Sequence, residues 1–167
     1  SAALGREVAW NSNVGVPFGQ VLKANGSPLT GIVDITTAKN SAFALDNQGI
    51  IWAWGNNSGG RLGLGDAQYR TFATPISSVT GFTRLSPGRS AALRSNGSLW
   101  QWGGSFFNYE PQRVADFTLL RDVAGAFAVG ADGRVWWWGY YSGGEAPTTP
   151  QPVRPELGSD GSQLVLP

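Results

Sequence analysis

The sequence predicts an all-β protein built from a repeated strand–turn–strand unit, and three observations support this fold class. A Trp-x-Trp-Gly stretch occurs three times, at residues 50–55, 98–103 and 134–139. Turn-forming glycine is abundant, with 24 copies among 167 residues. No stretch shows sustained helical periodicity, so we expect almost no helix. At this length, and with 41% hydrophobic residues, residues 1–167 are expected to fold as a single domain.

Each Trp-x-Trp strand follows a tight turn that ends in glycine, at Gly49, Gly97 and Gly133. These glycines are 48 and 36 residues apart, and the glycines that end the three Trp strands keep the same spacings. Asn96-Gly97 and Asp132-Gly133 are typical of hairpin turns, because the chain takes positive φ there. Before the turns lie segments of small and apolar residues, at 41–45, 89–93 and 125–129. The unit is therefore predicted to be strand, four-residue turn, strand.

The Trp strand is predicted to pack on both of its faces. Side chains alternate along a strand, so Trp52 and Trp54 share one face, while Ile51 and Ala53 share the other. Both faces are apolar, which indicates a neighbour on each side. Rings at a strict structural period are expected in the core, at Trp52, Trp54, Trp100, Trp102, Trp136 and Trp138.

A further apolar segment precedes each hairpin, at residues 32–35, 79–82 and 114–117. Two interpretations remain open, since these segments could be further strands or entry loops to the unit. Pro28, Pro75, Pro111 and the proline-rich residues 147–152 fall between the units. Proline cannot donate to a sheet ladder, so these positions suit connections or sheet edges.

Composition excludes several classes of site. Twelve basic and eleven acidic residues are scattered along the chain, which argues against a nucleic-acid partner or a membrane footprint. Cysteine and histidine are absent, so disulfides, thiolate sites, His-dependent nucleophiles and His-ligated metals are excluded. No apolar run approaches the roughly 20 residues that span a bilayer. We expect a soluble protein with no cofactor, no metal site and no membrane insertion; without methionine, residue 1 is not expected to be the translation start.

Residues 52–66 carry a specific resemblance. They read Trp-Ala-Trp-Gly-Asn-Asn-Ser-Gly-Gly-Arg-Leu-Gly-Leu-Gly-Asp, which resembles the signature of the RCC1 repeat, the regulator-of-chromosome-condensation family of β-propellers. The likeness covers about residues 30–145. The sequence Trp-Ala-Trp-Gly-Asn-Asn-Ser resembles bacterial or phage versions of the repeat. The sequence departs from the family in three ways: the usual His before the first hairpin strand is missing, the 36-residue spacing is short, and three full repeats cannot form the family's seven-bladed ring.

The resemblance implies a β-propeller-like domain with three full RCC1-type repeats, at residues 30–66, 79–110 and 114–145. A fourth, composite unit is expected from residues 1–20 and 153–167. Residues 5–13 match 49–57, and residues 162–166 match 41–45, so the termini carry complementary halves of a unit. Propellers commonly close in this way, because closure removes exposed sheet edges. Three architectures fit: a small closed ring, a ring completed by self-association through the terminal strands, or an arc of a larger propeller.

Aromatic residues in the loops after the Trp strands are the candidate ligand or partner site, because exposed aromatic side chains tend to mark binding surfaces. Trp137 also belongs here, since it occupies the face on which the other repeats have Ala53 and Gln101. An alternative is that these side chains fill the centre of the protein's own shortened ring. The candidates are Phe106, Phe107, Tyr109, Trp137, Tyr140 and Tyr141.

The remaining motifs favour structural roles over catalysis. Residues 59–65 are glycine-rich, but the Lys-Ser/Thr ending and following helix of a phosphate loop are missing, so we expect a tight loop closed by Asp66. Asp46 and Asp132 lie at hairpin turns, and no Asp-x-Asp-x-Asp metal loop occurs. We therefore predict that the protein is not an enzyme.

The predicted function is a non-catalytic binding or scaffold module that recognises a protein or surface partner through its loops. A propeller is a scaffold whose function depends on its loops. The resemblance leaves two alternatives, a lectin-like glycan-binding propeller and a guanine-nucleotide exchange factor acting on a small GTPase. It also suggests a secreted, surface-associated or phage structural protein.

Overall fold

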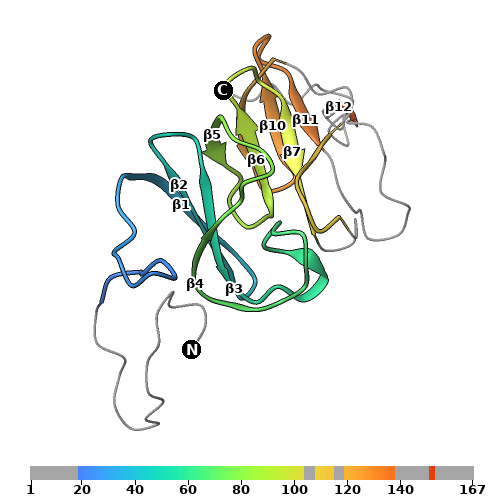
Figure 1. Ribbon diagram of the computed structural model, residues 1–167. Coiled ribbons are helices and arrows are strands. Elements are labelled where there is room, and N and C mark those ends of the chain that lie inside the picture. Colours follow the sequence, from blue (N-terminus) through green and yellow to red (C-terminus); the bar gives the residue numbers. More distant parts are fainter. Residues whose placement is uncertain (1–18, 104–107, 115–118, 138–150, 153–167) are drawn as a thin grey trace, which may run out of the picture.

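The computed structural model describes residues 19–103, 108–114, 119–137 and 151–152 (Figure 1). These residues form three four-stranded antiparallel sheets, and the one helical element among them is a short 3-10 turn, Ser58–Gly60. The prediction of a nearly all-β protein is confirmed. Each sheet runs in sequence order and is called a blade below. The first blade comprises β1 (Ile32–Ala38), β2 (Ser41–Asp46), β3 (Ile51–Gly55) and β4 (Arg70–Pro75); the second β5 (Phe82–Leu85), β6 (Ala91–Arg94), β7 (Leu99–Gln101) and β8 (Gln112–Arg113); the third β9 (Leu120–Ala124), β10 (Phe127–Gly130), β11 (Val135–Trp137) and β12 (Gln151–Pro152).

The predicted hairpins form the second and third strands of every blade. The three turn glycines have the expected positive φ, 79° at Gly49, 73° at Gly97 and 81° at Gly133. In the first hairpin, Asp46 Oδ1 accepts hydrogen bonds from the amides of Gln48 and Ile50 at 3.0 and 2.9 Å. Its other oxygen accepts one from the Trp52 indole at 2.9 Å. The turn carboxylate therefore holds both the backbone and the first Trp ring.

The apolar segments before the hairpins have two different roles. Segment 32–35 begins β1, and segment 79–82 ends where β5 begins. In the third blade the first strand is β9, which lies beyond the predicted segment 114–117. Val114 instead follows β8 and is buried, as Ile76 is after β4. Val114 is apolar because it packs between blades, so apolarity alone did not locate the third blade's first strand.

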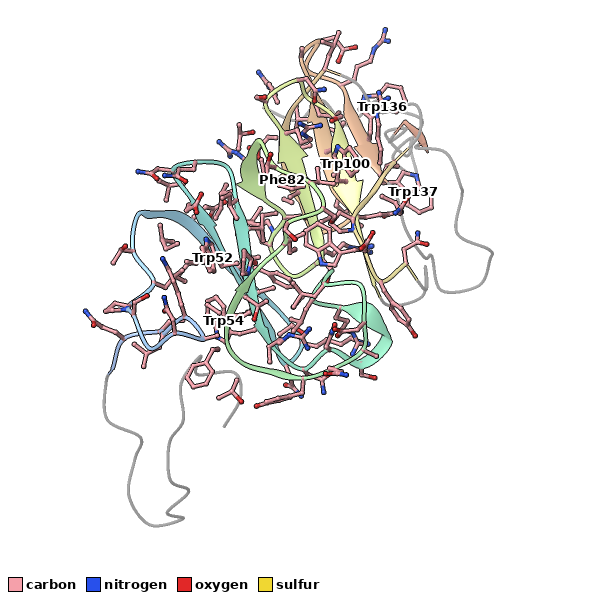
Figure 2. The ribbon with its side chains drawn as sticks, viewed as in Figure 1. Trp52, Trp54, Phe82, Trp100, Trp136 and Trp137 are labelled. Carbon is pink, nitrogen blue, oxygen red and sulfur yellow. The ribbon has the colours of Figure 1, made fainter. Side chains whose placement is uncertain are left out.

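Neighbouring blades pack face to face, and the Trp strands of the first two blades are packed on both faces as predicted. We call the face of a blade turned to the following blade its trailing face, and the opposite one, which carries the paired Trp residues, its leading face. On the first blade Ile51 and Ala53 lie in the cluster that joins it to the second blade, while Trp54 packs on the other side, with Val21 and Leu29. In Figure 2, Trp52 and Trp54 project from the same blade.

Aromatic and aliphatic side chains fill the two interfaces between blades. Phe43 of the first blade meets Trp102 of the second edge to face, with ring centroids 5.8 Å apart and planes at 70°. Trp54 and Trp102 are buried as predicted, whereas Trp52, Trp100 and Trp136 are partly buried. Trp138 lies outside the described residues, as do the strands predicted for the composite fourth unit, so that unit stays a prediction.

Candidate functional site

The first strands of the three blades lie beside one another and enclose a hollow. β1, β5 and β9 are each the edge strand of their sheet, with β1 contacting β5 and β5 contacting β9. The hollow between them has a volume of about 610 Å³. Its lining comprises Val33, Asp34, Thr83, Arg84, Leu85, Pro87, Asp122, Val123 and Ala124. Its lining residues come from all three blades.

Charged side chains at one repeated strand position link the blades around this hollow. Asp34, Arg84 and Asp122 are equivalent, because each lies opposite the corresponding residue of its second strand. The Asp34 carboxylate accepts a hydrogen bond from the Leu85 amide of the next blade at 3.0 Å. Arg84 Nη1 donates to Asp122 Oδ1 at 2.9 Å, and both side chains are about half exposed, 53% and 49%. Such an exposed pair contributes only about 0–1 kcal/mol, so its main effect is on the charge of the surface.

A β-bulge occurs at the same place in every first strand. The register shifts around Val33, Thr83 and Arg121, and all three side chains are exposed. Bulges re-aim side chains and discourage an edge from pairing with another strand. In β1 the bulged residue is Val33, which is 64% exposed and lines the hollow. Ile35 is 73% exposed but lies outside this lining, paired with Ala44.

The glycine-rich loop after β3 has the structural role predicted for it. Gly59, Gly60, Gly63 and Gly65 all have positive φ, between 68° and 82°. The buried Asn57 side chain donates to the Asp66 carbonyl at 2.9 Å and accepts from the Leu62 amide at 2.8 Å. Asp66 Oδ1 accepts from the Gln68 amide at 2.8 Å, and Asp66 Oδ2 from Arg70. The loop is thus closed by its own side chains rather than arranged around a phosphate.

Asp66 should titrate below an ordinary aspartate. The hydrogen bond from Arg70 lowers the pKa of Asp66 from its ordinary value of 3.8, and the Gln68 amide lowers this pKa further. A depressed pKa in the folded state means that this interaction stabilises the fold above the unfolded pKa and is lost as pH falls through the folded pKa. We expect Arg70→Gln to raise the pKa of Asp66 in an NMR titration of the carboxyl carbon. An unchanged titration curve would contradict the assigned role of Arg70.

Two of the six predicted site residues lie in the described part of the chain, and the structure does not bring them together. Tyr109 is 43% exposed, but its ring lies against the backbone of Gly60, and its carbonyl accepts from the Gly65 amide at 2.9 Å. Its position therefore serves contact between the first two blades. Trp137 is half-buried on β11, opposite Phe127 of β10 (Figure 2). Phe106, Phe107, Tyr140 and Tyr141 lie outside the described residues.

The hollow was not predicted from the sequence, although a signal for it exists. Aligning β1, β5 and β9 by register would have placed Asp34, Arg84 and Asp122 at one position of the repeat. That alignment needs the start of β9, which segment 114–117 obscured. Elsewhere in residues 19–103, 108–114, 119–137 and 151–152, no group of three or more carboxylates could hold a metal ion. The same residues include no helix long and apolar enough to cross a membrane.

Comparison with known proteins identifies the fold. No protein-family model matches the sequence, and no curated protein does. Human WBSCR16 matches with a TM-score of 0.71 and 17% identity, over 92% of this chain and 45% of that one. Prp20p from Saccharomyces cerevisiae matches with a TM-score of 0.61 and 16% identity, over 82% and 44%. A chain in the structure of Kap60 bound to yeast RCC1 (Prp20) matches with a TM-score of 0.67 and 16% identity, over 93% and 43%.

This chain spans less than half the length of each of these proteins. The match to WBSCR16 covers 92% of this chain and so includes strands of all three blades. The arrangement of the blades is therefore shared, as well as the topology within each blade. The bacterial or phage origin suggested by the sequence of the repeat stays a prediction. The chain has the fold of an RCC1-like β-propeller.

Proposed function

We propose that this protein is a non-catalytic recognition module that binds a protein partner at the hollow between β1, β5 and β9. The observation that carries the proposal is the aliphatic side chain of Val33, which is 64% exposed and lines the hollow together with the charged Arg84 and Asp122. Exposed apolar surface rimmed by polar groups is typical of protein interaction sites. The partner's complementary surface would present an apolar side chain to Val33, with charged groups at its rim.

Structural neighbours support a binding role. The Prp20p structure was described together with its binding properties to Gsp1p and histones, and yeast RCC1 (Prp20) was solved bound to Kap60. Because this chain is only 16% identical in sequence to these proteins, their partners are candidates to be tested for this chain. A shared propeller scaffold can present different partner surfaces, so the site has to be tested on this chain's own residues.

Three carboxylates of the described residues support the non-catalytic part of the proposal. Asp34 accepts a backbone amide, Asp46 accepts two amides and an indole, and Asp66 is paired with Arg70. Each is therefore engaged in local structure. Glycoside hydrolysis would need two carboxyl groups facing one another across a substrate cleft. Of the aromatic candidates for glycan binding that the structure describes, Tyr109 packs against Gly60 and Trp137 lies on a sheet face.

The proposal is tested by introducing one charged side chain into the lining of the hollow. Immobilised full-length chain is used to recover a partner from extract, and the purified partner, with Gsp1p and core histones alongside, is titrated against variants. We expect Val33→Asp, at an exposed residue of the lining, to weaken binding at least tenfold, because burying an unpaired carboxylate is unfavourable. Ala67→Asp, at an exposed position of the glycine-rich loop, is the matched control. Equal affinities for wild type and Val33→Asp would exclude the hollow as the binding site. Accelerated nucleotide release from Gsp1p would favour the exchange-factor alternative.

A further inference from the structure

The third blade has an apolar trailing face that no described residue covers. Phe127 pairs with Trp137 and Val129 with Val135, so the four side chains share one face of β10 and β11. Phe127 is 52% exposed and Val135 is 38% exposed. The equivalent positions of the first blade are Phe43, Leu45, Ile51 and Ala53, and each of these is at most 1% exposed because the second blade covers them.

The turn of the third hairpin shows the same difference independently. A Cβ on Gly49 would lie 3.0 Å from Gly81 Cα, and one on Gly97 would lie 2.7 Å from Leu119 Cα. The first two turns are therefore tightly packed against the following blade. At Gly133 a Cβ would meet nothing within 4 Å. In the first two blades a following segment covers this face and the turn. Both observations indicate that the described part of the chain supplies no such neighbour to the third blade.

In the first two blades the cover begins with the residue that follows the fourth strand. Ile76, directly after β4, is 1% exposed, and its amide donates to the Ile51 carbonyl at 2.8 Å. Val114, directly after β8, is 7% exposed, and its amide donates to the Leu99 carbonyl at 2.9 Å. The trailing face of a blade is thus covered by the chain as it leaves that same blade.

The third blade continues into the same kind of sequence. Pro152 of β12 pairs with Trp136, as Pro75 pairs with Trp52 and Arg113 with Trp100. The next residue is Val153, which holds the position of Ile76 and Val114 and follows proline as Ile76 does. Phe82 and Leu120, which begin the covering strands, each lie seven residues beyond the fourth strand. Residues 153–167 number fifteen and include Leu164-Val165-Leu166, so they are long and apolar enough for the same task.

We propose that residues 153–167, which lie outside the described residues, dock on the trailing face of the third blade. Val153 would lie against Val135, and the apolar run 164–166 would cover Phe127 and Trp137. A second copy is a less favourable occupant, because propeller-like stacking needs a free leading face. The leading face of the first blade is already covered by Val21 and Leu29. The docked segment concerns a different surface from the hollow, so either proposal can fail without the other.

Hydrogen exchange of the full-length chain tests this proposal. In wild type we expect residues 127–137 to be protected equally at low and high protein concentration. Val153→Asp should accelerate their exchange at least tenfold, because a carboxylate cannot take the buried position that Ile76 holds in the first blade. Gly161→Asp puts the same charge in the same segment, at the position that corresponds to the half-exposed Arg84 and Asp122, and should leave exchange unchanged. Residues 41–55 of the first blade serve as the internal reference.

Three results would overturn the proposal. Rapid exchange of residues 127–137 in wild type would mean that nothing covers the face. Protection that grows with concentration, together with a doubled mass in light scattering, would identify a second copy as the occupant. Unchanged exchange in Val153→Asp would show that the protection arises from another segment. If the Val153→Asp protein loses structure throughout, the milder Val153→Ala should still raise exchange at residues 127–137 above that at residues 41–55.

Discussion

Replacing Gly97 with alanine is expected to destabilise the protein by about 2–5 kcal/mol. The residue has φ of 73°, and an L side chain in this region costs roughly 1–2 kcal/mol. Its Cβ would also lie 2.7 Å from Leu119 Cα and 2.8 Å from the Leu120 amide nitrogen. These contacts are with backbone, which cannot rotate away, so overpacking adds about 1–3 kcal/mol. Chemical denaturation of the two proteins would measure the difference.

Gly26 provides the matched control for this substitution. It has φ of 80°, and its amide closes a turn by donating to the Lys23 carbonyl at 2.9 Å. The Gly97 amide donates to the Arg94 carbonyl in the same way, also at 2.9 Å. Nothing lies within 4 Å of its Cβ position, so Gly26→Ala should lose only the backbone preference, about 1–2 kcal/mol. Equal losses at Gly97 and Gly26 would mean that the close approach of the second and third blades does not depend on this glycine.

Local sequence chemistry was sufficient to predict the hairpins. The turn glycines need positive φ, the neighbouring Asp or Asn supplies turn hydrogen bonds, and strand alternation assigns the side chains to two faces. Asp46 and Gly49 are recognisable without any knowledge of distant residues. The same local reasoning identified the glycine-rich loop as a closed structural loop, with Asp66 accepting a nearby amide.

Contacts between blades could not be predicted in the same way, because their partners are far apart in sequence. The Arg84–Asp122 pair joins residues 38 positions apart, and the Asp34–Leu85 bond joins residues 51 positions apart. Whether an aromatic ring is exposed also depends on residues that are distant in the sequence. Tyr109 is a loop aromatic whose ring lies against Gly60 of the neighbouring blade, a contact that its position in the sequence did not predict.

Replacing Trp102 with alanine is expected to cost about 3–5 kcal/mol, the range for a large aromatic side chain removed from a core. Trp102 is 2% exposed, meets the Phe43 ring edge to face, and donates from Nε1 to the Arg61 carbonyl at 2.9 Å. The ring therefore joins the core of the first blade to that of the second. Thermal and urea denaturation should both show the loss, with a lower midpoint and an unchanged urea dependence if unfolding stays cooperative.

Trp100 and a conservative change separate the contributions to this effect. Trp100 lies two residues earlier on the same leading face but is only partly buried, and its indole bonds to the nearby Ser98 hydroxyl at 3.0 Å. Trp100→Ala should cost about 2 kcal/mol, in proportion to its smaller buried area. Trp102→Phe keeps an aromatic ring against Phe43 and should lose only about 1–2 kcal/mol, since the Arg61 carbonyl still accepts from Ser90 Oγ at 2.9 Å. If Trp100→Ala proved as damaging as Trp102→Ala, stability would depend on the repeated Trp pair as a whole and not on the ring that bridges the first two blades.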